Sequence, residues 1–329
     1  MKIYLDNAAT TPLDAEVVNA MIPVMQNQFG NPSSIHSWGR EVKTAIENAR
    51  KNVAKLLNAA PAEIFFTSGG TEANNTAIFC SIRDLGIKHA ISSKIEHHAV
   101  LHSLEEMAKE GKIKLSFVNL TPNGHVDLKH LEELLRDSKD KTIVSLMHAN
   151  NELGNLLPIK EVGELCSTYN AIFHCDTVQT MAHYPFDLKD IKVDFITCAA
   201  HKFHGPKGVG FLYINNKIKI SPFIFGGAQE RNMRGGTENV YGIVGLSKAL
   251  EIAYRDLDQH RKHVQDLKSY MADQLKNNIP GLEYNGDTMG NSLYTVLNVA
   301  FPPSENSEML LFNMDIAGIA CSGGSACSS

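Results

Sequence analysis

The sequence of 329 residues has no large excess of charge of one sign and no long hydrophobic run. Its formal net charge is −5, which argues against a nucleic-acid binder that works by bulk electrostatics. No apolar stretch is long enough to span a membrane. The first residues, "MKIYLDNAATT", lack the apolar core of a signal peptide. We therefore expect a cytoplasmic protein without membrane or direct nucleic-acid partners.

The cysteines lack the spacings of common metal and redox motifs. There are six of them: Cys80, Cys166, Cys175, Cys198, Cys321 and Cys327. Because no two form a CxxC pair, we expect neither a structural zinc site nor a thioredoxin-like motif, and we assign no metal ligands. In a reducing compartment all should be free thiols. The apolar neighbours of Cys80, Cys175 and Cys198 indicate inert core residues, whereas Cys327 has small polar neighbours.

Apolar, β-branched runs alternate with helical patterns over the first two thirds of the chain. Strands are predicted at 63–68, 88–93, 113–118, 142–149, 171–176, 194–199 and 208–214. Helical segments such as 71–86 and 158–170 lie between them, which is typical of βαβ units. We predict an α/β fold in which a mainly parallel, seven-stranded sheet lies between helices.

The rest of the chain predicts a second, smaller α/β domain. The pattern is helical from about 237 to 279, reads as a strand at 292–301 and is helical again at 304–315. A chain of this length can form two domains. We place the large domain at 14–255 and the small one at 1–13 plus 256–329.

Polar residues follow several predicted strands, at the edge where ligands bind in such sheets. The stretch "SGGTEANN" (68–75) opens a helix, and its glycines, helix amides and Thr71 hydroxyl could bind a phosphate. The alternative is an ordinary turn and N-cap. Asp176 ends another strand, with Gln179 three residues later. It could meet a cation or serve as a helix cap.

Lys202 follows the strand 194–199, beside His201. A partly desolvated lysine can form a Schiff base with an aldehyde, although most lysines in loops lie on the surface. A phosphate cup, a strand-end acid and a strand-end lysine together suit pyridoxal 5′-phosphate (PLP). Histidines in 92–100 could cover its ring, and amides in 147–154 could bond its hydroxyl or a substrate carboxylate.

Nine motifs spread along the chain resemble the cysteine desulfurases of the NifS/IscS type, within the class V aminotransferase family of fold-type I PLP enzymes. They are "YLDNAATT" (4–11), "GNPSSIHSWGR" (30–40), "FTSGGTEANN" (66–75), "EHHAV" (96–100), "NNELG" (150–154), "HCDTVQ" (174–179), "HKFHGPKGVG" (201–210), "MRGGTENV" (233–240) and "SGGSACSS" (322–329).

The resemblance implies a role for each residue that matches a family motif. Lys202 would bind the PLP aldehyde and move protons, and Asp176 would protonate the pyridine nitrogen. His97 would stack on the ring, and Gln179 and Asn151 would lie at the ring hydroxyl. Gly70, Thr71 and His201 would hold the phosphate, and Thr237 would reach the phosphate of the other subunit, which implies a homodimer.

The C-terminal stretch "CSGGSACSS" (321–329) has no hydrophobic period, so it is either a frayed tail or a mobile arm that carries a nucleophile. The resemblance favours the arm. It implies that Cys327, as a thiolate, takes sulfur from L-cysteine, giving L-alanine and a persulfide. The sulfur would pass to an acceptor such as an iron–sulfur scaffold or a tRNA-thiolation enzyme. Cys321 is the fallback nucleophile.

The sequence departs from the family at two places. Ala199 replaces the usual serine or threonine three residues before the lysine, so one phosphate hydrogen bond should be missing. The family's chains continue past the cysteine loop, where an arginine binds the substrate carboxylate. This sequence stops at Ser329, so we expect the small domain to be incomplete, with Arg234 as a conceivable substitute for that arginine. Another class V enzyme, such as a selenocysteine lyase or small-molecule transaminase, and an inactive PLP-binding scaffold are the alternatives.

Overall fold

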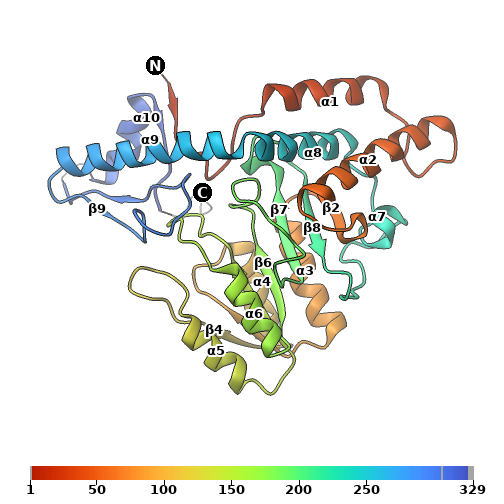
Figure 1. Cartoon of the computed structure of the whole chain (residues 1–329), viewed down its shortest axis with the longest axis horizontal. Coiled ribbons are helices and arrows are strands. Elements are labelled where there is room, and N and C mark those ends of the chain that lie inside the picture. The colour runs from red at the N-terminus through yellow and green to blue at the C-terminus, as the bar shows by residue number, and fades with distance from the viewer. Residues whose placement is uncertain (1, 305–306, 325–329) are drawn as a thin grey trace.

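The computed structural model describes residues 2–304 and 307–324. Cys327, the predicted nucleophile, lies outside the described residues. Figure 1 shows a central sheet with helices around it, and the long helix α9 (Leu257–Asn278) leading away from it to β9 and α10.

One seven-stranded sheet organises the chain. Its strands are β2 (Ile64–Thr67), β3 (His89–Ser92), β4 (Lys114–Phe117), β5 (Thr142–Met147), β6 (Ile172–Asp176), β7 (Phe195–Ala199) and β8 (Gly210–Ile214). Their order is β2-β8-β7-β6-β5-β3-β4, and all pairs are parallel except the two that β8 forms with β2 and β7. The predicted fold class and all seven strands are confirmed.

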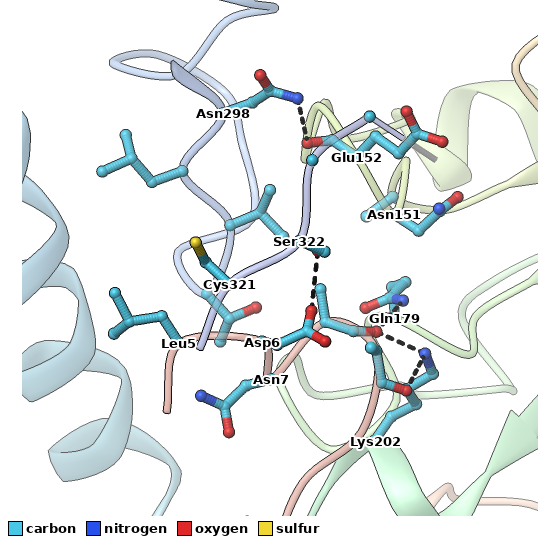
Figure 2. A pocket seen from close by; sticks show the side chains of 18 of the residues that line it. Leu5, Asp6, Asn7, Asn151, Glu152, Gln179, Lys202, Asn298, Cys321 and Ser322 are labelled. Carbon is cyan, nitrogen blue, oxygen red and sulfur yellow. Dashed lines mark hydrogen bonds between the residues drawn. The ribbon is translucent and has the colours of Figure 1, made fainter. Parts of the chain in front are cut away.

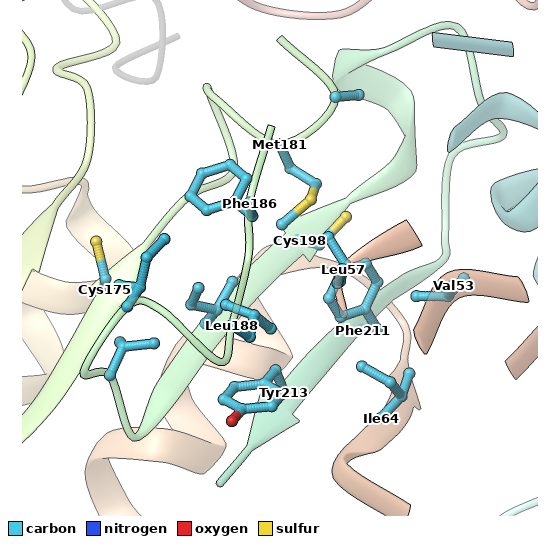
Figure 3. Close-up of a cluster of buried hydrophobic side chains, with 14 of the residues drawn as sticks. Val53, Leu57, Ile64, Cys175, Met181, Phe186, Leu188, Cys198, Phe211 and Tyr213 are labelled. Carbon is cyan, nitrogen blue, oxygen red and sulfur yellow. The ribbon is translucent and has the colours of Figure 1, made fainter. Parts of the chain in front are cut away.

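Helices cover both faces of this sheet, as a mainly parallel sheet requires. On one face, α2 (Ser37–Leu56), α5 (Leu128–Asp137), α6 (Ile159–Thr168) and α8 (Val240–Arg255) pack in a single apolar cluster with the strands. On the other face lie α3 (Gly70–Leu85) and α4 (His98–Lys109). Figure 3 shows part of the first cluster, which includes Val53, Leu57 and the β8 side chains Phe211 and Tyr213.

The same clusters place the cysteines that were predicted to be inert. Cys80, Cys175 and Cys198 are buried free thiols, as is Cys166. Burial raises the pKa of each of these four thiols well above its usual range, which keeps them protonated and unreactive. The interpretation of Cys80, Cys175 and Cys198 as core residues is therefore confirmed.

The remaining elements lie outside the large sheet. They are the helices α1 (Ala15–Asn27), α7 (Gln229–Asn232) and α10 (Leu310–Ile316), and the short strands β1 (Ile3–Tyr4), β9 (Glu283–Tyr284), β10 (Val299–Ala300) and β11 (Ile319–Ala320). Strand β1 pairs with β11 in parallel, and β9 pairs with β10 in antiparallel fashion. Residues 3–4 therefore lie beside residues 319–320.

One expectation for the C-terminal third needs correction, and a second is confirmed with a change of helix type. The predicted strand 292–301 is reduced to Val299–Ala300 because its partner β9 offers only two residues for pairing. The residues before it, such as Leu293 and Tyr294, are buried by side-chain packing instead of strand pairing. The predicted helix 304–315 is a 3-10 turn at Ser307–Met309 followed by α10. No helix among the described residues is long and apolar enough to cross a membrane.

Candidate active site

A cavity of about 860 Å³ opens beyond the carboxyl ends of the parallel strands. One wall consists of residues that directly follow strands or begin helices, such as Asp176 after β6 and Ala199 at the end of β7. The opposite wall comes from residues 4–9, α9, residues 294–299, Phe301, α10 and residues 321–324. The cavity therefore lies where an α/β sheet is expected to bind its ligand.

Lys202 ends a 3-10 turn, Ala200–Lys202, that follows β7 directly. Its Nζ donates to the carbonyl oxygens of Ala8 (2.5 Å) and Ala9 (3.0 Å), as Figure 2 shows from within the cavity. Gln179 Nε2 donates to the same Ala8 carbonyl at 3.0 Å. The N-terminal segment thus orients the lysine amine and the glutamine amide toward the cavity.

Asp176 is held by a chain of hydrogen bonds that the sequence did not reveal. Its Oδ2 accepts from Asn74 Nδ2 (2.7 Å) and its Oδ1 from the Val178 amide (2.9 Å). Asn74 Oδ1 lies 3.1 Å from His174 Nε2, and Ser145 Oγ lies 2.7 Å from His174 Nδ1. Burial lowers the pKa of His174 to about 4, so a neutral ring donates through Nε2. A rigid carboxylate of fixed orientation results.

The sequence contains signals for this series of hydrogen bonds around Asp176. His174 lies two residues before Asp176 on the same strand, so both side chains point to the same face of the sheet. Asn74 lies one turn into the helix that follows the glycine turn. A buried polar side chain at each position could have been linked to Asp176, but only the packing of α3 against β6 brings them together.

The glycine turn before α3 approaches the cavity closely. A Cβ atom at Gly70 would lie 2.6 Å from Val178 Cγ2, so a larger residue would displace that side chain. Gly69 has φ +153°, which L-residues rarely adopt. The first amides of α3 are thereby exposed to the cavity beside Thr71.

His97 caps α4, and this contact fixes its tautomer. Its Nδ1 accepts from the Ala99 amide at 3.1 Å, so the ring proton of the neutral form lies on Nε2. Burial lowers the pKa of His97, and the nearby Lys202 lowers it further, while Asp176 acts in the opposite direction. His97 therefore presents a neutral ring to the cavity.

Glu96, the residue before His97, is a buried acid that sequence reasoning did not single out. Its Oε1 accepts from Ser93 Oγ and from the Met147 amide, both at 3.1 Å, while its Oε2 is buried without a hydrogen-bond partner among the described residues. Burial, with a smaller effect of Asp176, raises the pKa of Glu96 to about 8. Near neutral pH this side chain is mostly uncharged.

His201 and Asn151 complete the part of the wall that the sequence predicted. His201 Nδ1 lies 3.2 Å from Thr10 Oγ1, and burial lowers the pKa of this histidine to about 4. Asn151 is half-buried and lines the cavity. It follows Asn150, whose Oδ1 accepts from the amides of Glu152 and Leu153 and so shapes the turn.

The structure brings together eight of the ten predicted site residues. Those that line the cavity are Gly70, Thr71, His97, Asn151, Asp176, Gln179, His201 and Lys202. Thr237 is exposed and is not among the lining residues. Cys327 lies outside the described residues.

Two further residues considered from the sequence differ in their positions. Arg234 bonds Glu72 and does not line the cavity, so its suggested role at the substrate carboxylate finds no support in this chain. Cys321 does line the cavity and is half-buried, as Figure 2 shows beside Ser322. No group of three or more metal-ligating side chains occurs within residues 2–304 and 307–324.

Similar proteins place the chain in a family. The protein-family model described as "Aminotransferase class-V" matches residues 3–329. A Bacillus subtilis protein described as putative cysteine desulfurase IscS 1 is 46% identical, over 99% of this chain and 85% of its own length. The cysteine desulfurase IscS of Dictyoglomus turgidum is 45% identical, over 100% and 82%. The solved structure of a NifS-like protein superposes with a TM-score of 0.93 at 38% identity, over 98% and 88%. The chain therefore belongs to the class V aminotransferase family, in the group of the IscS- and NifS-type cysteine desulfurases.

Proposed function

We propose that this chain is a PLP-dependent enzyme that removes sulfur from L-cysteine, leaving L-alanine and a persulfide on Cys327. The observation that carries the proposal is the convergence of Lys202, Asp176 and the Gly70 turn in one cavity. An amine, a carboxylate and a set of helix amides are the three groups that the aldehyde, pyridine nitrogen and phosphate of PLP require.

The residues present fit this cofactor. A side chain at Gly70 would collide with Val178, so the backbone there is kept open for a phosphate. The Asn74 and Val178 donors hold Asp176 as a hydrogen-bond acceptor suited to a protonated pyridine nitrogen. When bound, PLP would supply an electron sink for the electrons released at the substrate Cα.

The side chains around the cofactor site would divide the remaining work. Lys202 Nζ, oriented by the Ala8 and Ala9 carbonyls, would hold the cofactor and then accept and return a proton. His97 would cover the ring and can donate from Nε2. Gln179 and Asn151 would bond the ring hydroxyl and the substrate, while Thr71 and His201 would complete the phosphate site.

The sulfur step would belong to Cys327. Its thiolate would attack the substrate sulfur, the bond between that sulfur and Cβ would break, and Cβ would gain a proton to become the methyl group of alanine. Both electrons and all atoms are accounted for without an added oxidant. The residues before it, Cys321 to Gly324, line the cavity, and Ser322 Oγ donates to Asp6 at 2.9 Å. The segment that leads to Cys327 thus starts beside the site.

A second copy of the chain would complete the assembly. Large apolar side chains are exposed around α1 and α2, including Phe29 (74% exposed), Ile35 (91%) and Trp38 (51%). Such a surface is typical of an interface. Exposed Thr237 would then reach the phosphate site of the partner. Sedimentation that shows a monomer at working concentration would contradict this part of the proposal.

Several predictions from the sequence belong with this function. The division into a domain at 14–255 and one at 1–13 plus 256–329 is supported by the sheets, because the seven-stranded sheet uses only residues 64–214. The sulfur acceptor is proposed as an iron–sulfur scaffold or a tRNA-thiolation enzyme. The cytoplasmic location, and the lack of membrane and nucleic-acid partners, remain predictions.

Mass spectrometry of the intact protein before and after addition of L-cysteine tests the proposal. We expect the PLP-loaded protein to gain one or more sulfur atoms on the peptide that contains Cys327, and a thiol reductant to reverse the gain. Cys327→Ser should keep the cofactor but gain no sulfur and release no alanine. The matched control Cys321→Ser should still gain sulfur and release alanine. A PLP-loaded protein that gains no sulfur would contradict the assignment.

A further inference from the structure

An ion pair lies directly behind the glycine turn. Arg234 Nε donates to Glu72 Oε1 at 3.0 Å, and Arg234 Nη2 donates to Glu72 Oε2 at 3.2 Å. The second oxygen also accepts from the Ser68 amide at 2.9 Å. The side chain of Glu72 is only 8% exposed and that of Arg234 25%. One carboxylate therefore connects the arginine to the backbone of the turn that precedes α3.

The position of Glu72 creates an electrostatic problem for an anion site. Glu72 lies in the first turn of α3, next to Thr71. The amide end of this helix faces the cavity. A bound phosphate there would meet the negative charge of Glu72 through partly buried surroundings, where charges interact more strongly than in water. Burial opposes ionisation of Glu72, but the hydrogen bonds from Arg234 and Ser68 outweigh it, and the pKa of this carboxyl is lowered. Glu72 is thus ionised, and Arg234 balances its charge.

The loop that carries Arg234 is firmly held. Residues 230–232, which form most of the short element α7, do not have right-handed helical geometry: all have positive φ, between 45° and 67°, which is a strained arrangement for side chains other than glycine. A buried pair holds it in place: Arg50 donates to both oxygens of Glu230 at 2.7 and 2.9 Å, and the Phe66 amide donates to the same carboxylate at 2.8 Å. The loop is thereby anchored to β2, the strand that leads into the glycine turn.

We propose that Arg234 is a positioning residue for the cofactor phosphate and acts through Glu72 without touching the ligand. It cancels the charge of Glu72 while that carboxylate holds the Ser68 amide and so keeps the turn in shape. The inference rests on the proposed function, because it takes the anion at this turn to be the PLP phosphate. Thr237, proposed to reach the second copy, lies three residues further along the same loop.

A double-mutant cycle on the holoenzyme tests this role. PLP retention is measured by visible absorbance during dialysis for the wild type, Arg234→Met, Glu72→Gln and the double variant. We expect Arg234→Met to weaken PLP binding by about tenfold, because an uncompensated charge then faces the phosphate. Glu72→Gln should not weaken it, and the double variant should return to within about threefold of the wild type. Arg234→Lys, which keeps the charge, should retain PLP almost as well as the wild type.

Reloading with pyridoxal, which lacks the phosphate, separates this role from a purely structural one. Arg234→Met should bind pyridoxal as the wild type does. Equal weakening for pyridoxal and PLP, or a double variant no better than Arg234→Met, would overturn the inference while leaving the proposed function intact. A wild-type protein that cannot hold PLP at all would overturn the proposed function, and the inference with it.

Discussion

Ala199 ends β7 in the cavity wall and is 2% exposed. A Cβ atom built on Gly70 would lie 3.6 Å from the Cβ of Ala199, so this side chain lies close to the glycine turn. A hydroxyl at this position would have a phosphate within reach if PLP binds as proposed. Alanine offers no donor there, and the adjacent Cys198 points to the opposite face of the strand.

Replacing Ala199 with serine should therefore tighten PLP binding. One added hydrogen bond contributes about 0.5–1.5 kcal/mol net, which corresponds to roughly two- to tenfold in affinity. Titration of the apoprotein with PLP, followed by visible absorbance, measures the change. Cys198→Ser is the matched control, because it places a hydroxyl on the core side of the same strand and should not tighten binding. Unchanged affinity in Ala199→Ser would contradict the proposed place of the phosphate.

At the scale of elements, residues 5–11 connect the end of the described chain to the turn that carries Lys202. The Leu5 amide donates to the Ala320 carbonyl at 2.8 Å, and Asp6 accepts from Ser322. A few residues later, the Thr11 hydroxyl donates to the His201 carbonyl at 2.9 Å. Figure 2 shows Leu5, Asp6 and Asn7 between Cys321 and Lys202. Strand β11, which leads toward Cys327, is thus coupled to the lysine turn through residues 5–11.

Breaking the pairing of β1 with β11 should increase local opening of residues 318–322, which lead toward the cysteine segment. Leu5→Pro removes the amide that donates to Ala320, while Leu5→Ala keeps it and is the control. We expect amide exchange at residues 318–322 to become about tenfold faster in Leu5→Pro, the size of one lost hydrogen bond. Exchange measured on the corresponding peptide checks this. Similar exchange in the two variants would show that the pairing does not restrain β11.

At the scale of the whole molecule, buried histidines and Glu96 give opposite dependences of stability on pH. Burial lowers the pKa of His148, His174 and His183 to about 4 each, against 6.5 as the reference value. Between pH 6.5 and 4 the unfolded chain binds more protons at these sites, so stability falls as the pH falls. Burial raises the pKa of Glu96 to about 8 from 4.5. Its contribution to stability is therefore lost as the pH rises from 4.5 to 8.

The free energy of unfolding should therefore be greatest near pH 6.5. Each histidine contributes a slope of at most about 1.4 kcal/mol per pH unit below this value, and Glu96 an opposite slope of the same limit. Urea unfolding at pH 5 to 8 measures the profile. Glu96→Gln should gain stability relative to the wild type as the pH rises from 5 to 8. A difference between the two proteins that is independent of pH would contradict a buried, neutral Glu96.

The sequence by itself determined the large sheet and the polar residues that line the cavity at the ends of its strands. Buried parallel strands need continuous apolar, β-branched runs, and such runs can be read locally. Since the carboxyl ends of parallel strands meet at one edge, the residues that follow them, such as Asp176 and Lys202, were predictable as neighbours. The predicted strand 292–301 was confirmed only at Val299–Ala300, because strand formation there depends on a partner that the local pattern does not specify.

Only the tertiary structure decided how distant segments meet at this edge. The Ala8 and Ala9 carbonyls reach Lys202 from nearly two hundred positions away in the chain, and Arg234 reaches Glu72 across 162 positions. No local period encodes such pairs, because they arise when separate elements pack. The same holds for the neutral state of Glu96, which depends on how completely the surrounding elements exclude water.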